Sequence, residues 1–373
     1  MRSADTYGQS FNKMTVANDL RVFTADGPLA AGDRVRIHHW IKRGAISPEI
    51  HTFAQDLPFG RSGRYLRHPL RTIEAHRRVS FEARRKFTGT SVVYRQVSPF
   101  SRGSLEQQAL RRSGFGVFDF DDALHLDKRK GVGALLAPAV KAQKTVEWAN
   151  RVVAGNEFLA EWAADFCRDV VTIPSCVEPN DYEQKSEYEL SAAPRIGWIG
   201  SWSTEPYLDS VADALLAANK KFGAKLVIVG AARTVRPRLE SMVERHIWSE
   251  TSASSLAATF DVGIMPLSNS PYEHGKCGYK LLQYGAAGVP VVGSPVGANK
   301  SILRRFEASA PVTASEWSDS LLDLLGASAE ERHRLGARAR SIVQRDFSYQ
   351  RWQDEWVSAI TGVDTHGPVP RRF

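Results

Sequence analysis

Short apolar runs rich in β-branched residues alternate with amphipathic stretches along most of the chain. In the second half the apolar runs are RIGWIG (195–200), KLVIVG (225–230), DVGIMPL (261–267) and VPVVGSP (289–295). In the first half they are shorter and cover residues 20–25, 50–53, 91–94, 116–120, 151–154 and 170–173. Continuous apolar runs of this length are typical of strands buried on both faces of a parallel sheet. We therefore predict strands at all ten places.

Stretches with a helical period separate these strands. They cover residues 33–43, 72–87, 104–113, 133–149, 207–221, 252–260, 277–287 and 329–345. Strands that alternate with helices predict α/β domains with helices on both faces of each sheet. Three prolines and an acidic stretch between residues 174 and 194 indicate a connector. We predict a first domain at 1–175, a linker at 176–194, a second domain at 195–345 and a final segment at 346–373.

The composition fits this two-domain α/β interpretation. The chain has 373 residues, of which 43% are hydrophobic and 24% are charged, so a disordered or low-complexity protein is excluded. No apolar run approaches the ~20 residues of a membrane span, and the first twenty residues lack the apolar core of a signal peptide. We expect a cytoplasmic protein. Its three cysteines, Cys167, Cys176 and Cys277, have neither zinc-site nor disulfide-framework spacing.

The positive charge is confined to the first half of the chain. Residues 1–175 hold 27 Lys and Arg against 18 Asp and Glu, whereas residues 176–373 hold 22 against 23. Between Arg61 and Arg112 there are 13 basic residues and three acidic ones. Two interpretations fit this segment: a solvated helix face, or a surface for an anionic partner such as membrane headgroups or a charged acceptor. No nucleic-acid-binding signature accompanies the charge, so we do not expect nucleic acid as a partner.

Small residues follow two strands of the second half. Gly200 closes the run at 195–200, Ser201 and Thr204 lie in the turn after it, and Gly230 closes the run at 225–230. In open α/β sheets, ligands bind beyond the carboxyl ends of the strands, where small residues let a ligand approach the backbone. Both places are candidate ligand contacts, although a glycine at a strand end more often just makes a tight turn.

The segment 274–292, HGKCGYKLLQYGAAGVPVV, is more specific. A glycine-containing loop leads into a helix at Gly278 and Tyr279, the helix ends at Gly288, and Pro290 starts a strand. A helix start offers unpaired N–H groups and a positive dipole end, which suit a diphosphate. Lys276 and Lys280 add positive charge beside it.

This segment resembles the signature of GT-B glycosyltransferases of the family 4 type. The family pattern is an acidic residue, Gly, aromatic, Gly, a second Glu, Ala, small, Ala, x, Gly, x and Pro-Val-Val. Aligned on Pro290-Val291-Val292, the second Glu falls on Gln283, which the resemblance places at the ribose, the loop glycine on Gly278 and the first acidic position on Gly275. Glu273 lies two positions before Gly275 and is the nearest acidic residue. The resemblance extends to Val117–Ala123 and Val153–Asn156 in the first half.

The resemblance implies a GT-B fold: two Rossmann-like domains with parallel sheets and an interdomain cleft. It also implies that the amphipathic segment 348–360 is a terminal helix that crosses back to the first domain. The implied activity is transfer of a hexose-type sugar, with retention of configuration, from a nucleoside-diphosphate sugar (UDP or GDP) to an acceptor hydroxyl. No metal or other cofactor is implied, because helix N–H groups and lysines would stabilise the leaving diphosphate. The donor site would comprise Gly200, Ser201, Thr204, Gly230, Glu273, Gly275, Lys276, Gly278, Tyr279 and Gln283.

Further candidates lie near the acceptor side. Asp121 and Asp122 follow an apolar strand and, with Lys280, are candidate catalytic residues; capping of the next helix is the competing role. Arg34 and Arg36 follow the first strand and are candidate acceptor contacts, with an ordinary solvent-exposed position as the alternative. We expect an acceptor that is a small molecule, glycan or lipid, and peripheral membrane contact through Arg61–Arg112.

Two other functions use the same fold. A nucleotide-sugar epimerase or phosphorylase is one, because a fold does not fix the reaction. A non-catalytic binding protein is the other, because Gln283 stands where the family has Glu and no cation follows the strand at 195–200.

Overall fold

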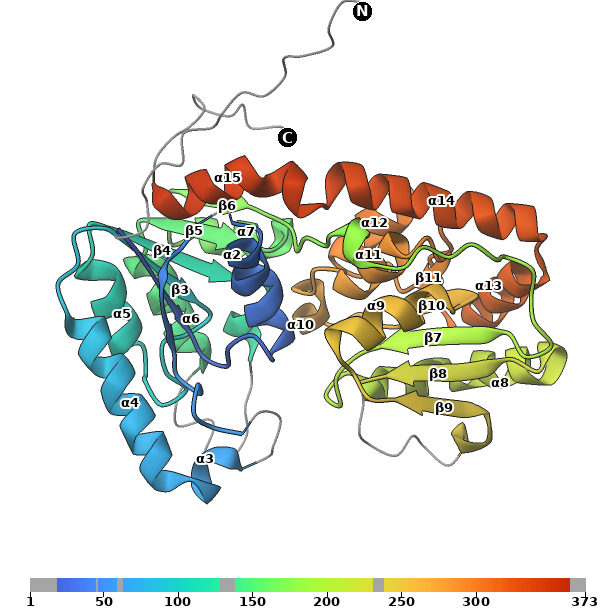
Figure 1. Cartoon of the computed structure of the whole chain (residues 1–373), viewed down its shortest axis with the longest axis horizontal. Helices are drawn as coiled ribbons and strands as arrows, with labels where there is room; N and C mark the ends of the chain where they lie inside the picture. The colour runs from blue at the N-terminus through green and yellow to red at the C-terminus, as the bar shows by residue number, and fades with distance from the viewer. Residues whose placement is uncertain (1–18, 45, 59–62, 128–137, 231–237, 363–373) are drawn as a thin grey trace, which may run out of the picture.

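The computed structural model describes residues 19–44, 46–58, 63–127, 138–230 and 238–362. Two parallel sheets lie side by side, one built from the first half of the chain and one from the second (Figure 1). Helices cover both faces of each sheet, so the predicted α/β architecture with two Rossmann-like halves is confirmed. Among the described residues, none of the helices has both the length and the apolar character needed to cross a bilayer.

The first sheet has the order β2-β1-β3-β4-β5-β6, and every neighbouring pair is parallel. Its strands are β1 (Leu20–Thr24), β2 (Glu49–Thr52), β3 (Thr90–Tyr94), β4 (Phe115–Phe120), β5 (Arg151–Ala154) and β6 (Val170–Thr172). All six were predicted. The central strands β1, β3 and β4 are buried almost throughout because helices pack on both of their faces.

The helices of the first half are α1 (Ala31–Asp33), α2 (His39–Lys42), α3 (Arg64–Arg67), α4 (Pro69–Arg84), α5 (Ser104–Arg111), α6 (Pro138–Trp148) and α7 (Glu157–Ala164). A π-helical segment, Arg34–His38, joins α1 to α2, so the predicted helix at 33–43 is one continuous helical segment. The start of the predicted helix at 133–149 lies outside the described residues. Asn156 caps α7 by accepting from the Leu159 N–H, 2.9 Å away.

The second sheet has the order β11-β10-β7-β8-β9 and is also parallel throughout. Its strands are β7 (Arg195–Ile199), β8 (Lys225–Val229), β9 (Val243–His246), β10 (Val262–Met265) and β11 (Val291–Gly293). Its helices are α8 (Ala212–Phe222), α9 (Glu250–Ala258), α10 (Pro271–His274), α11 (Tyr279–Ala286), α12 (Ala298–Phe306), α13 (Ala314–Gly326) and α14 (Ala329–Asp346).

Several elements were not predicted. β9 has the sequence VERH, which is charged and only half-buried because the strand lies at the edge of the sheet. The sequence analysis also missed α3, α7, α10, α12 and α13. Of these, α12 and α13 are amphipathic helices, and α13 begins with a capping box between Thr313 and Glu316. The capping box is the sequence signal that marks the start of α13.

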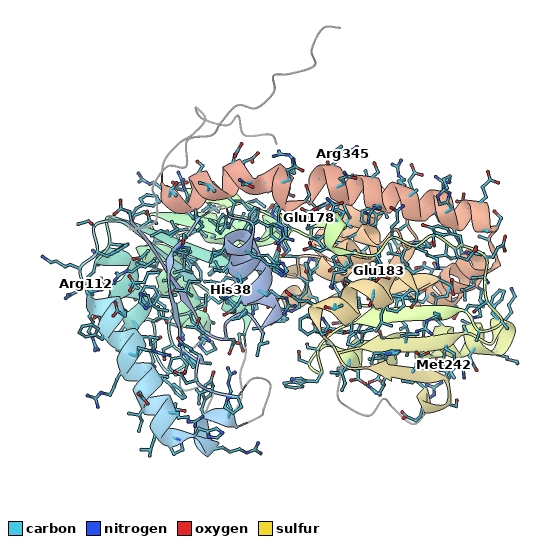
Figure 2. The ribbon with its side chains drawn as sticks, viewed as in Figure 1. His38, Arg112, Glu178, Glu183, Met242 and Arg345 are labelled. Carbon is cyan, nitrogen blue, oxygen red and sulfur yellow. The ribbon has the colours of Figure 1, made fainter. Side chains whose placement is uncertain are left out.

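The segment 176–194 packs closely on the second half. Lys185 forms a buried ion pair with Asp261, with Nζ 3.1 Å from Oδ1. The Tyr188 hydroxyl donates to the Gly288 carbonyl at 2.7 Å, and Arg332 donates to the Tyr188 carbonyl. Glu178 and Glu183, labelled in Figure 2, both lie on this segment, Glu178 near the junction of the two halves and Glu183 over the second half. Although its composition resembles a flexible connector, the segment is anchored.

The last described helix, α15 (Tyr349–Thr361), packs on the first sheet, whereas α14 packs on the second (Figure 1). The Trp356 ring stacks on Trp40, with centroids 4.8 Å apart. Arg151 donates to the Ser358 carbonyl at 3.1 Å. The chain therefore crosses from one half back to the other between Asp346 and Tyr349.

Candidate functional site

Strand order places the switch points of the two sheets. In the first sheet the chain leaves β1 toward β2 and then returns to the other side at β3; in the second it leaves β7 toward β8 and returns at β10. Ligands of open α/β sheets bind beyond the carboxyl ends of strands at such points. Residues after β1, β3, β7 and β10 are therefore the first candidates for a site.

A cavity of about 360 Å³ lies between the two halves. It is lined by residues of the segment that follows β1, of the connector, of the start of α9 and of α11: Arg34, His39, Lys42, Val177, Glu178, Asp181, Tyr182, Trp248, Glu250, Thr251, Ala253, Ser254, Tyr279 and Gln283. Three predicted site residues, Arg34, Tyr279 and Gln283, thus meet around one cavity although they come from opposite ends of the chain.

Two glycines lie at the carboxyl edge of the second sheet, and both have close neighbours. Gly230 has a φ of +108°, and a Cβ there would lie 2.7 Å from the Gly200 carbonyl oxygen. A Cβ on Gly200 would lie 3.0 Å from Cε of Lys280 and 2.4 Å from the Trp198 ring. Gly200, Gly230 and Lys280 therefore form one compact corner with no room for a side chain at either glycine. Ala231 and Ala232, which follow Gly230, lie outside the described residues.

Lys280 provides the positively charged group of this corner. Its Nζ lies 5.6 Å from the centroid of the Trp198 ring, and it belongs to the first turn of α11. Burial, together with the smaller effect of the nearby Lys276 charge, lowers the pKa of Lys280 to about 8. A partly desolvated cation beside a helix N-terminus is suited to bind an anion.

The start of α11 is built around Gly278. This residue is the N-cap with a φ of +69°, and a Cβ there would lie 2.4 Å from Cδ1 of Ile302. Only glycine fits this position without strain. One turn further along α11, the Gln283 side chain donates to the Tyr182 hydroxyl at 3.0 Å. Gln283 thus lines the cavity but is oriented by the connector.

Glu273 is held by two hydroxyl groups. Tyr207 and Ser270 both donate to its carboxylate, which places it next to the turn after β7. Burial alone would raise the pKa of Glu273, but these hydrogen bonds outweigh burial and keep the pKa below its usual value. In that turn Ser201 and Ser203 share a hydrogen bond, and the Thr204 hydroxyl donates to the Ser201 carbonyl. Ser201 and Thr204 thus support the turn that leads to Tyr207.

The loop between α10 and α11 contacts the first half directly. Lys276 Nζ lies 2.7 Å from Asp122 Oδ1, and the Asn156 amide donates to the carbonyls of His274 and Lys276 at 3.2 Å. A Cβ on Gly275 would lie 2.6 Å from the Ala123 backbone nitrogen. Gly275 and Lys276 therefore join the two halves at one side of the cleft. Asp122 is the first-half partner in this junction.

Asp121 has a different environment from Asp122. Its carboxylate accepts from the Tyr94 hydroxyl at 2.7 Å and from the Arg95 Nε at 2.8 Å. Burial would raise the pKa of Asp121, but Arg95 and Arg36 lower it below its usual value. A carboxylate stabilised in this way is a weak base, so the geometry favours an anchoring role. Arg95, with a φ of +57°, also bonds to Asp122 and was not identified from the sequence.

The two predicted acceptor arginines occupy different environments. The Arg34 guanidinium lies over the Trp248 ring, 4.2 Å from its centroid, and lines the cavity. Arg36 is 1% exposed and forms a bidentate ion pair with Asp119, at 2.9 and 3.0 Å. It points into the core of the first half and cannot contact an acceptor. The prediction failed at Arg36 because the partner of a buried arginine cannot be read from local sequence.

Sequence reasoning missed the cavity residues after β9 and in the connector. Trp248 and Glu250 follow the unpredicted strand β9, and His39 reaches Glu250 from the other half, with Nε2 2.9 Å from Oε1. The sequence signal was the capping pair Ser249 and Ser252 at the start of α9, which marks the end of a preceding element. Hydrogen bonding from His39 lowers the pKa of Glu250.

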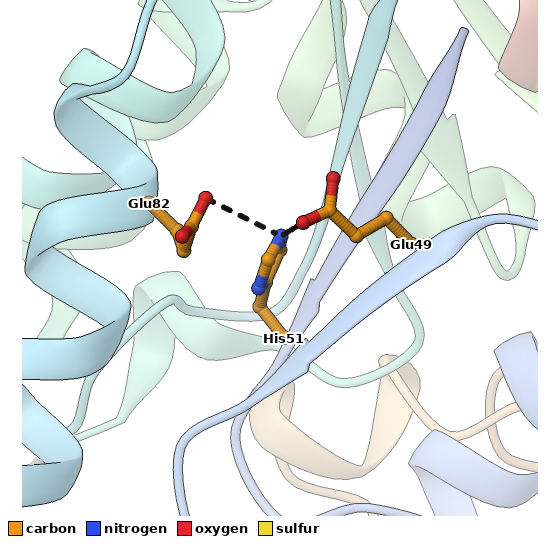
Figure 3. Close-up of side chains that lie close together, drawn as sticks. All are labelled: Glu49, His51 and Glu82. Carbon is orange, nitrogen blue, oxygen red and sulfur yellow. Dashed lines mark ion pairs between the residues drawn. The ribbon is translucent and has the colours of Figure 1, made fainter. Parts of the chain in front are cut away.

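A second group of titratable side chains lies on the edge strand β2 and on α4 (Figure 3). Glu49 and Glu82 lie 3.3 and 3.9 Å from the His51 Nε2. One histidine and two carboxylates would suit a divalent cation. However, the Arg85 guanidinium bonds to both carboxylates at 2.8 Å, so their charge is already compensated. We therefore assign this group to an ion-pair network.

Residues 193–327 match the family model of the Glycosyl transferases group 1. This match covers β7 through α13 and so includes α11 and the corner formed by Gly200, Gly230 and Lys280. No curated protein matches the sequence.

Several solved structures share the fold at low sequence identity. Anabaena HepE in complex with UDP and glucose superposes with a TM-score of 0.64 at 13% identity, covering 93% of this chain and 100% of that one. WaaG, a glycosyltransferase involved in lipopolysaccharide biosynthesis, gives 0.62 at 13% identity, covering 92% and 100%. TarM of S. aureus, in complex with UDP, gives 0.56 at 15% identity and covers 72% of this chain. The chain spans only 55% of TarM.

Proposed function

We propose that this chain is a glycosyltransferase that moves a hexose-type sugar from a nucleoside-diphosphate sugar to an acceptor hydroxyl with retention of configuration. The match of residues 193–327 to the group 1 family model and the fold shared with HepE support this proposal. The main support for this proposal is that Gly200, Gly230, the start of α11 and Lys280 come together beside a cavity shared by both halves. UDP is the favoured nucleotide, because HepE and TarM are both described as UDP complexes.

The donor would lie along the second half of the cleft. Its diphosphate would meet the first N–H groups of α11 and the Lys280 ammonium, which supply positive charge without a metal ion. Its ribose would meet Gln283, and its base the wall formed by Trp248 and Arg34. Glu273, held ionised by Tyr207 and Ser270, is the carboxylate available to the sugar.

The acceptor would enter from the first half, beside Asp122 and Arg34. We propose a glycan or lipid-linked acceptor because two of the similar structures contain saccharide ligands and the first half carries the excess of basic residues. Arg61, at the start of the basic segment, lies outside the described residues.

Calorimetry with UDP, GDP, ADP and dTDP in the presence of EDTA tests this proposal. We expect UDP to bind at micromolar concentration without metal. The other three nucleotides should bind at least tenfold more weakly. Failure of all four to bind would contradict the donor site. Incubation of the cognate nucleotide-sugar with and without acceptor then separates transfer from epimerase or phosphorylase activity, since an epimerase consumes the donor without any acceptor.

Substitution of Gln283 should separate recognition of ribose from recognition of phosphate. Gln283→Leu should lower UDP affinity about three- to tenfold, the effect of one or two neutral hydrogen bonds, and leave pyrophosphate affinity unchanged. Tyr182→Phe is the matched control, because it removes the partner hydroxyl but keeps the Gln283 amide. Equal losses for UDP and pyrophosphate in Gln283→Leu would show that the residue only supports the loop.

A further inference from the structure

Large apolar side chains are exposed together on α3 and α4. Relative exposures are 87% for Leu66, 80% for Leu70, 57% for Ile73 and 69% for Phe81. Ten large hydrophobic residues are exposed in the described parts of the chain, and four of them lie within these two helices. Single exposed apolar residues are common on protein surfaces, but a cluster marks an interaction site.

The spacing along α4 places these residues on one face. Leu70, Ile73, Arg77, Phe81 and Arg84 follow one another at intervals of three and four residues, which aligns them along a helix. The opposite face holds Ala75, Val79 and Ala83, which are buried against the first sheet. One face of α4 therefore provides its packing against the core. Core packing does not explain the large apolar residues on the outer face.

Arginines surround this apolar stripe. Residues 64–85 contain seven arginines and two glutamates. Arg78 and Arg85 are engaged with Asp56 and with Glu49 and Glu82, respectively. Arg67 and Arg77 are exposed, and neither makes an ion pair within the part of the chain that the structure describes.

The position of the helices leaves this face open. Figure 1 shows α4 along the outer edge of the first half, with α3 at the side of the molecule opposite α15. A hollow of about 710 Å³ lies along the same helix and is lined by His76, Arg77, Ser80, Phe81, Arg84 and Arg85. An apolar stripe next to an open, arginine-lined hollow provides contacts for both acyl chains and phosphate headgroups.

We infer that the outer face of α3 and α4, formed by Leu66, Leu70, Ile73, Phe81 and the neighbouring arginines, docks on an anionic phospholipid surface. A helix with apolar and basic residues on its exposed side lies in the membrane interface with its apolar side chains inserted. Anionic headgroups attract the arginines that flank it. A nucleic acid or an acidic peptide would satisfy the arginines but would leave four large apolar side chains in water.

This inference rests on the proposed function and deepens it, because a transferase docked in this way would meet an acceptor carried by a lipid. Docking itself can be measured without any transfer reaction. The test is therefore vesicle binding by the full chain, with UDP calorimetry on the same samples. Loss of vesicle binding with intact UDP binding would concern only docking, and the reverse would concern only the donor site.

The wild-type chain should sediment together with phosphatidylcholine vesicles that contain about 40% phosphatidylglycerol. The amount of protein that sediments with pure phosphatidylcholine vesicles should be at least tenfold lower. Leu66→Ser/Leu70→Ser/Ile73→Ser and Arg67→Glu/Arg71→Glu/Arg77→Glu should each lower binding at least tenfold. Val140→Ser/Val312→Ser and Lys220→Glu/Lys221→Glu are matched controls on other exposed positions and should bind like the wild type.

The expected pattern also includes salt. Because attraction between exposed charges is screened over ~8 Å at physiological ionic strength, 0.5 M NaCl should weaken vesicle binding several-fold and leave UDP affinity nearly unchanged. Absence of binding to anionic vesicles, or equal losses in the control variants, would overturn the inference. Salt-sensitive binding that the serine variant does not affect would also overturn it, since that result indicates a purely ionic partner.

Discussion

Lys280→Gln should reduce kcat/KM for sugar transfer by about 100-fold or more. In the proposed site, Lys280 is the cation nearest the start of α11, and negative charge develops on the diphosphate as the sugar leaves. Removing one preorganised donor to a developing negative charge costs on the order of 10²–10³ in rate. Because burial holds the pKa of Lys280 at about 8, below its usual value, the charged lysine costs stability at neutral pH. The glutamine variant should therefore fold at least as stably as the wild type at pH 7.

The pH dependence supplies a second measurement on the same residue. Lys280 carries its proton below a pH of about 8 and loses it above, so UDP affinity of the free enzyme should fall as the pH rises through 8. The bound diphosphate raises the pKa of the ammonium in the complex, so UDP affinity should keep falling until the pH passes this higher pKa. Lys280→Arg keeps its charge over this range and should abolish the decline.

Lys276→Gln is the matched control for charge. Lys276 bonds to Asp122 across the two halves, so we assign it to the junction between the halves and not to the diphosphate. Its removal should weaken contacts between the halves and should not remove the decline of UDP affinity above pH 8. An unchanged UDP affinity in Lys280→Gln at pH 7 would exclude Lys280 from the donor site.

The sequence predicts those parts of the site whose residues lie close together along the chain or at the ends of neighbouring strands. Gly278, Tyr279 and Gln283 share one loop and one helix, so their relative positions follow from helical geometry and the flanking strand. The corner formed by Gly200 and Gly230 could also be predicted, because both glycines end apolar strands that parallel pairing brings side by side.

Residues that meet across the cleft could not be predicted in the same way. Trp248 and Glu250 follow β9, a charged strand of four residues without an apolar run, so no strand end marked them. Arg95 sits between Asp121 and Asp122 because the sheet aligns the ends of β3 and β4, and its positive φ turns the side chain toward them. Such contacts depend on tertiary packing, which the pattern of apolar positions does not encode.

The same limit explains why Arg36 was assigned to the acceptor. Basic residues just after a strand of an open sheet normally face the ligand side, yet the π-helical segment that contains Arg36 directs it inward to Asp119. There the guanidinium also donates to the Ile173 and Pro174 carbonyls, at 2.6 and 3.1 Å. Arg36 therefore ties the segment after β1 to the ends of β4 and β6.

Asp119→Ala should lower the free energy of unfolding by about 3–5 kcal/mol, because it leaves the buried Arg36 guanidinium without its counter-charge. Arg36→Lys should also destabilise the protein, since an ammonium cannot reproduce the two parallel hydrogen bonds. In contrast, Arg36→Met/Asp119→Leu removes both charges at similar volume and should unfold within about 2 kcal/mol of the wild type. Urea denaturation followed by tryptophan fluorescence measures all three values. If Arg36 contacts an acceptor instead, Asp119→Ala will unfold like the wild type while acceptor KM rises in every Arg36 variant.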